Sequence, residues 1–221
     1  MKNDRTEYTE QALARLSQLY LEKRKYKKAI PVLERLESDA DFPQNIIFAQ
    51  SNLMKSYYQL LNYEKTIEYA DKVLANPKIQ NEVKSDAKIF TARAAMQTRD
   101  TESAKQAYAE VQQIATGELA AEALYYDAYF KNQEGQYKKS NEVVQKLAKD
   151  FSGYRFYGAK GLVLMAKNFY ALKDAYQATY ILESVIKNFT DYPEVTDEAE
   201  IELKDIKDKE AKTNSSIQTD Q

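Results

Sequence analysis

The side chains of this chain that could do chemistry are recurrent cations and aromatic rings rather than a catalytic set. Histidine and cysteine are both absent, which removes the commonest general base, the commonest neutral metal ligand and every thiolate. The sequence has no glycine-rich phosphate loop, nucleophile elbow or zinc or calcium spacing, so neither catalysis nor a cofactor or metal is predicted. The remaining chemistry is recognition, in which cations pair with carboxylates and aromatic rings anchor apolar groups.

A helical pattern that recurs along the chain positions these side chains. Residues 162–189 read as two helices separated by a polar break at Lys173-Asp174, with apolar residues three and four positions apart. A small or slender residue stands at the same place in each copy of the pattern, 36 to 38 residues apart, at Ser17, Met54, Ala92, Ala128 and Ala166. Stacked hairpins of this kind bury one continuous core, which a lone hairpin cannot do.

The pattern predicts an all-α chain. Residues 1–209 would form one solenoid of about five hairpins and a capping helix, and residues 210–221 a disordered tail. The expected hairpins are 7–38, 43–75, 81–114, 118–150 and 155–189, with the capping helix at about 194–209. Only 5 glycines and 4 prolines are present, too few for a turn-rich β-sandwich.

Residues 7 to about 206 resemble tetratricopeptide-repeat (TPR) proteins, because bulky, small and aromatic residues follow one another at that repeat's spacing. The resemblance implies a right-handed α-solenoid whose first helices line a concave face. The last unit and tail are also similar to C-terminal repeats of large envelope-associated proteins of Gram-negative bacteria, and to repeat lipoproteins of outer-membrane assembly. The lipidation cysteine of those lipoproteins is absent. A cell-envelope or periplasmic location is therefore favoured if this is a fragment of a longer chain, and a cytoplasmic one otherwise.

In such a fold, the exposed positions of the first helices form a groove that suits a peptide with apolar anchors and an acidic group. The predicted groove residues are Lys55, Tyr58, Arg93, Met96, Tyr125, Tyr129, Lys167 and Tyr170. The alternative interpretation is that the tyrosines pack between hairpins and the cations are ordinary solvated side chains. The lysine and asparagine pattern of a carboxylate clamp for chaperone C-termini is absent.

The predicted function is a non-catalytic scaffold that binds a protein or peptide partner. The alternative is a spacer or self-assembly segment of a longer array, whose first hairpin stacks on preceding repeats or on a second copy. The outer face of the first helix contains Tyr8, Gln11 and Arg15, and this polarity favours a true terminus. A net charge of −2 and the lack of an apolar run of about 20 residues argue against nucleic-acid binding and membrane insertion.

Overall fold

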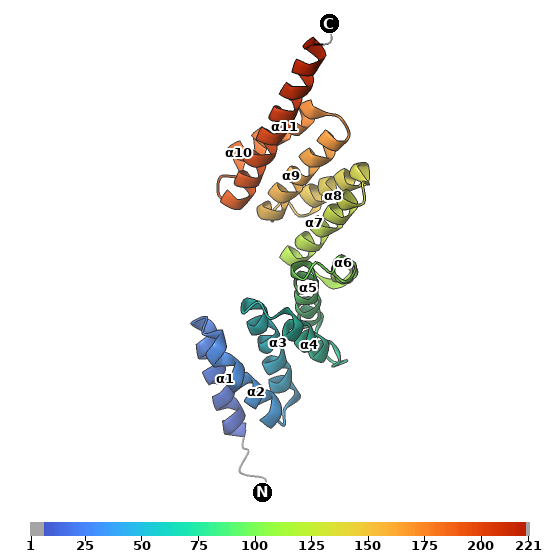
Figure 1. The fold of residues 1–221 in the computed structure, drawn as a ribbon. Helices are drawn as coiled ribbons and strands as arrows, with labels where there is room; N and C mark the ends of the chain where they lie inside the picture. The colour runs from blue at the N-terminus through green and yellow to red at the C-terminus, as the bar shows by residue number, and fades with distance from the viewer. Residues whose placement is uncertain (1–6, 220–221) are drawn as a thin grey trace. The chain divides into compact units, whose positions relative to one another are not determined.

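The structure, a computed structural model, describes the backbone of residues 7–219 and the side chains of residues 9–212. All regular secondary structure in this range is helical, and the chain divides into two compact units, Met1–Ala115 and Thr116–Gln221 (Figure 1). The all-α class and the solenoid of helical hairpins predicted from the sequence are confirmed.

Unit 1 contains three helical hairpins, each with a first and a second helix. These are α1 (Glu7–Glu22) with α2 (Tyr26–Asp39), α3 (Pro43–Gln59) with α4 (Tyr63–Leu74), and α5 (Asn81–Gln97) with α6 (Thr101–Ile114). Successive hairpins pack together through α2 and α3 and through α4 and α5. Their core is built from alanine, leucine and valine, with Leu33, Leu53 and Val73 among the residues with no solvent exposure.

Unit 2 contains two hairpins and a final helix. These are α7 (Gly117–Gln133) with α8 (Tyr137–Asp150), α9 (Arg155–Ala171) with α10 (Ala175–Asn188), and α11 (Pro193–Thr219). α11 packs against both α9 and α10, in the place of a first helix of a further hairpin. It continues to Thr219, past residue 209, where the sequence predicts the capping helix to end and a disordered tail to begin. Residues 220 and 221 of that predicted tail lie outside the described residues.

The small residue of each pattern is completely buried. Ser17, Met54, Ala92, Ala128 and Ala166 all have 0% exposure. Side chains of this size let the first helix approach its neighbours closely, and the aromatic residue three positions later, such as Tyr57 or Phe169, packs at the edge of the core. The recurrence in the sequence therefore marks helix contacts rather than solvent-facing positions.

Every hairpin turns through the same backbone geometry. The second residue after the first helix has a left-handed φ, at Arg24, Leu61, Arg99, Gly135 and Lys173. At Leu61, for example, its N–H donates to the carbonyl of Tyr58, and the N–H of Asn62 donates to the carbonyl of Tyr57, both at 2.9 Å. The same pair of hydrogen bonds recurs in the other four turns, so it satisfies carbonyls at the helix end that would otherwise lack partners.

Leu61 offers a test of the strain in these turns. Its φ is +60°, a region that disfavours side chains with a Cβ, and its side chain is 70% exposed. Leu61→Gly is therefore expected to raise the free energy of unfolding by about 0.5 to 1 kcal/mol, because it relieves strain and removes few contacts. Urea unfolding would measure the change. Leu60→Gly is the control and should be destabilising, since Leu60 has a φ of −92°. Destabilisation by both substitutions would contradict the expectation.

Candidate functional site

The predicted groove residues of unit 1 lie on two neighbouring first helices, α3 and α5. The Lys55 ammonium is 2.5 Å from the Asp86 carboxylate, a contact that joins the two helices. Tyr58 meets Phe90 edge-to-face, with ring centroids 5.1 Å apart, and the Arg93 guanidinium lies 5.5 Å from the centre of the same ring. The structure thus brings Tyr58 and Arg93 together on Phe90. We call Lys55, Tyr58, Phe90, Arg93 and Met96 the α3–α5 face.

The side chains of the α3–α5 face are all partly exposed. They combine two cations with two aromatic rings and a flexible thioether, and tyrosine and arginine are the residue types that carry most binding energy at protein interfaces. Phe90 and Asp86 were not predicted as part of the site. Phe90 stands three residues before Arg93, the spacing of neighbours on one helix face, and this was the available signal.

In unit 2, the predicted cation on α9 is already paired with α11. The Lys167 ammonium lies 2.7 Å from Glu198 and 3.0 Å from Glu202. Burial lowers the pKa of Lys167, but the hydrogen bonds to Glu198 and Glu202 outweigh it, and the pKa lies above its ordinary value. Tyr170, further along α9, donates its hydroxyl to Glu210 at 3.2 Å. Both side chains therefore help to hold α11 in place.

The two predicted tyrosines of α7 differ in exposure. Tyr125 is only 8% exposed, as expected if it packs between helices, and burial raises the pKa of its hydroxyl. Tyr129 is partly exposed and contacts Tyr126 and Phe130. The alternative interpretation from the sequence, that aromatic rings pack between hairpins, therefore applies to Tyr125.

Lys160 on α9 is a further cation that was not predicted. Its ammonium lies 4.7 Å from the centre of the Tyr125 ring and 5.7 Å from that of Phe156. Burial lowers its pKa, although the nearby carboxylate of Glu198 acts in the opposite direction. The contacts with both rings hold this lysine beside the predicted Tyr125. The signal in the sequence was Phe156, which stands four residues before Lys160, at the spacing of neighbours on one helix face.

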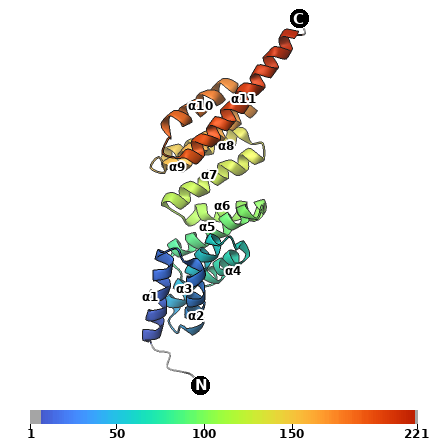
Figure 2. The ribbon, with the colours of Figure 1, turned by 60° about the vertical axis from the view of Figure 1, so that its left-hand side comes forward.

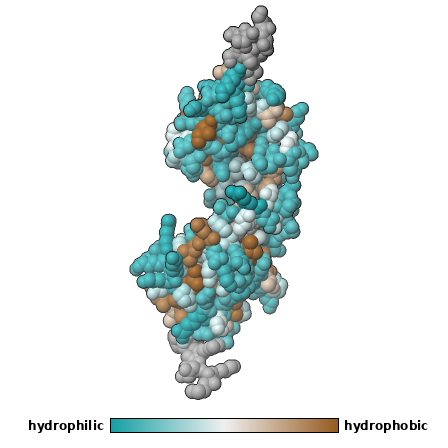
Figure 3. Space-filling model, viewed as in Figure 1, coloured by the Kyte–Doolittle hydropathy of each residue, from teal (hydrophilic) through white to brown (hydrophobic). Residues whose placement is uncertain are grey.

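The described residues contain no group of three or more acidic side chains close enough to hold a metal ion. None of the helices in the same range is long and apolar enough to cross a membrane. On the visible side of the molecule, apolar side chains form small patches among hydrophilic ones (Figure 3). What the two sets of first helices offer chemically is hydrogen bonding, ion pairing and aromatic contact.

Comparisons with known proteins identify the fold. No protein-family model and no curated protein sequence matches the chain. The solved structure of the MamA protein matches with a TM-score of 0.65 and 13% identity, over 86% of this chain and 96% of that one. A putative kinesin light chain with TPR-like repeats from Podosopora anserina matches with a TM-score of 0.60 and 15% identity, over 81% and 95% of the two chains. The identities are low, so the likeness shows the fold alone: this chain has the TPR-like fold of stacked helical hairpins.

Proposed function

We propose that the protein is a non-catalytic scaffold that binds an extended or helical segment of a partner protein across the α3–α5 face. The observation that carries the proposal is the arrangement of Tyr58 and Arg93 on Phe90, which holds two interface-forming side chains in fixed places. Such a preformed surface loses little side-chain freedom when a partner binds.

The chemistry of this face indicates what the segment carries. The partly exposed rings of Tyr58 and Phe90, with Met96 on the same helix as Phe90, suit an apolar side chain as anchor. Lys55 on α3 and Arg93 on α5 are cations that suit an acidic group beside that anchor. Lys55 keeps 42% of its side-chain surface exposed while paired with Asp86, so it can hydrogen-bond to a second carboxylate without breaking the existing pair.

The function predicts that Lys55→Gln/Arg93→Gln weakens partner binding about tenfold or more while the fold is retained. The measurement is quantitative cross-linking and affinity capture from the native cell, followed by titration of the captured protein against wild type and variant. Glutamine keeps a similar length and avoids placing a second carboxylate beside Asp86. Circular dichroism and urea unfolding check that the variant is folded.

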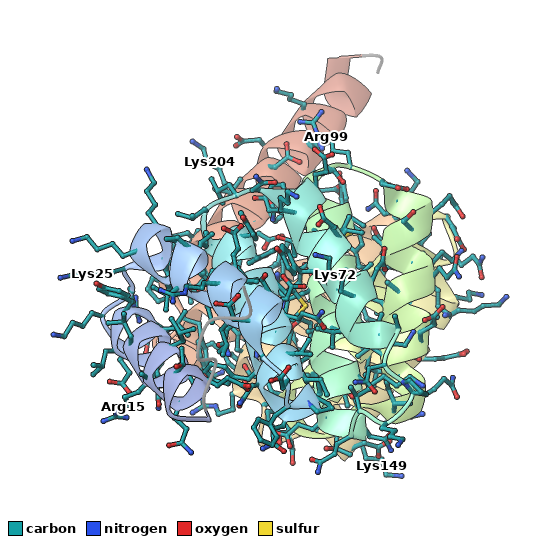
Figure 4. All side chains as sticks on the ribbon, turned by 90° about the horizontal axis from the view of Figure 1, so that it is seen from below. Arg15, Lys25, Lys72, Arg99, Lys149 and Lys204 are labelled. Carbon is teal, nitrogen blue, oxygen red and sulfur yellow. The ribbon has the colours of Figure 1, made fainter. Side chains whose placement is uncertain are left out.

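Lys72→Gln is the matched control. Lys72 lies in the same unit but on the second helix α4, where it pairs with Glu37 and lies 4.2 Å from the centre of the Tyr69 ring (labelled in Figure 4). It therefore has the same chemistry and a similar exposure, 39%, on another surface. Loss of the partner only in the double variant supports the proposal. Equal affinity for wild type and the double variant, or equal loss with Lys72→Gln, would place the interface elsewhere.

A further inference from the structure

The first helix, α1, carries an apolar stripe that no other described helix covers. Ala12, Leu16 and Leu19 are all exposed, the two leucines at 40% and 39%. Their spacing of four and three residues puts them on one side of the helix. In both ribbon views, α2 and α3 lie on one side of α1 (Figures 1 and 2). We call Ala12, Leu16 and Leu19 the N-terminal face.

The positions equivalent to Ala12 and Leu19 are buried in the later repeats of the same unit and in those of unit 2. The equivalents of Ala12 are Ala49, Ala87, Gly161 and Ala199, and those of Leu19 are Ser56, Ala94, Asn168 and Ile206. None of these eight residues is exposed. In α3, the equivalent of Leu16 is Leu53, with 0% exposure.

The helix that covers these positions is the second helix of the preceding hairpin. A Cβ placed on Gly161 of α9 would lie 3.1 Å from Val144 and 3.3 Å from Leu147, both on α8. Further along α9, at the equivalent of Leu19, Asn168 donates hydrogen bonds to Ser140 and Asn141, again on α8. The N-terminal face thus has the residue types and spacing of a helix-packing surface, but no described helix packs on it.

The last helix, α11, has charged residues on its exposed side. At the small position of the repeat, where five earlier residues have no exposure, α11 carries the exposed Lys204. Ile201 is 69% exposed there, but Lys204 and the exposed Asp205 and Asp208 lie near it. A stack in which the first helix of one copy packs on α11 of another would remove these charges, including the Asp205–Lys209 ion pair, from water, at a high cost in free energy.

Charges beside the N-terminal face favour one arrangement of two copies. Arg15 and Glu22 are both exposed, lie seven residues apart on the same edge of the stripe, and carry opposite charges. Arg15 projects away from the helices of unit 1 (Figure 4). Two α1 helices that pack antiparallel place Arg15 of each copy beside Glu22 of the other, whereas parallel packing around a twofold axis puts these edges on opposite sides of the interface, where the charges do not meet.

We propose that two copies of this chain associate through their N-terminal faces, with their α1 helices antiparallel around a twofold axis. Leu16 and Leu19 of each copy interdigitate with those of the other, and the small Ala12 allows close approach. The twofold contact closes on itself and ends at the dimer, because the same surface is used on both copies. The inference does not rest on partner binding by the α3–α5 face, which lies on different side chains.

Sedimentation velocity across a range of concentrations tests the proposal with the full chain. Wild type is expected to pass from monomer to dimer, and Leu16→Glu/Leu19→Glu to remain monomeric throughout. Leu172→Glu is the control, since Leu172 is 38% exposed but lies in unit 2, and it should dimerise like wild type. Circular dichroism confirms that each variant is folded.

A charge exchange tests the antiparallel arrangement itself. Arg15→Glu is expected to raise the dimer dissociation constant about tenfold at low salt, and Arg15→Glu/Glu22→Arg to restore it, because both cross-copy pairs are re-formed. A monomeric wild type would overturn the proposal and leave the face to a helix of a different protein. A dimer unaffected by the leucine substitutions, a failure of the exchange to restore binding, or assembly beyond the dimer would overturn it as well.

Discussion

Replacing Asn168 with leucine is expected to lower the free energy of unfolding by about 2 to 3 kcal/mol, because it leaves buried polar groups without partners. Asn168 has no exposed surface. Its amide nitrogen donates to Ser140 Oγ at 2.8 Å and to Asn141 Oδ1 at 2.7 Å, and its amide oxygen accepts from Asn132 at 2.6 Å. The network joins α7, α8 and α9, so its loss weakens both the hairpin and the packing of the next helix.

Urea unfolding of the full chain measures this change, and hydrogen exchange of the α7, α8 and α9 amides locates it. Asn132→Leu is the control, because Asn132 is partly exposed and water can replace the lost partner, so a loss below about 1 kcal/mol is expected. If Asn168→Leu cost no more than Asn132→Leu, the buried network would not be what holds these helices in register.

Replacing Tyr157 with phenylalanine is expected to lower the free energy of unfolding by about 1.5 to 3 kcal/mol, because it removes the hydroxyl that donates a hydrogen bond to a buried carboxylate. The Tyr157 hydroxyl donates to the Glu122 carboxylate at 2.6 Å, and the two residues are 9% and 2% exposed. The ring stays in place, so the packing against Tyr125 and Phe156 is retained. What is lost is a donor to a carboxylate that water cannot readily reach.

Tyr170→Phe provides a matched control on the same helix. Tyr170 also donates its hydroxyl to a carboxylate, that of Glu210, but at 3.2 Å and with both side chains partly exposed. Its removal should cost much less than that of the Tyr157 hydroxyl, as for other exposed contacts. Thermal and urea unfolding compare the two variants. Similar losses for both would show that burial does not strengthen the bond between Tyr157 and Glu122.

Periodicity predicted the hairpins because the small residues and the apolar faces recur with the helices they position. It could not predict the network around Asn168. An asparagine in a helical pattern is usually solvent-facing, and its three partners lie 27, 28 and 36 residues away in the chain. Equivalent positions carry Ser56 and Ala94, both buried, so the pattern marked the site as internal while the residue type argued against it.

The candidate site was predicted in its residue types more than in its contacts. Lys55 and Lys167 are repeat-equivalent, and each pairs with a carboxylate 31 residues later, Asp86 or Glu198. That separation is shorter than the repeat period, because the second residue lies nearer the start of the next first helix. The stagger between neighbouring helices fixes this offset, and a one-dimensional pattern does not contain it.

The first helix shows a similar limit. Gln11 and Arg15 made its outer face read as polar, and both are exposed, but Leu16 and Leu19 are exposed beside them. The side chain of Tyr8 lies outside the described residues. The prediction of a polar outer face was therefore incomplete: helical spacing alone does not say which of two adjoining faces lacks a neighbour.

The common geometry of the five hairpin turns has a consequence for how such a chain can change over evolution. The turn is closed by main-chain hydrogen bonds, and only Gly135 among its five left-handed residues is a glycine. A Cβ on Gly135 would meet no atom within 4 Å, so its surroundings are open. The hairpin tips can therefore acquire inserted loops or grafted epitopes while the stacked helices keep their sequence constraints, and new specificities can arise there without redesign of the interior.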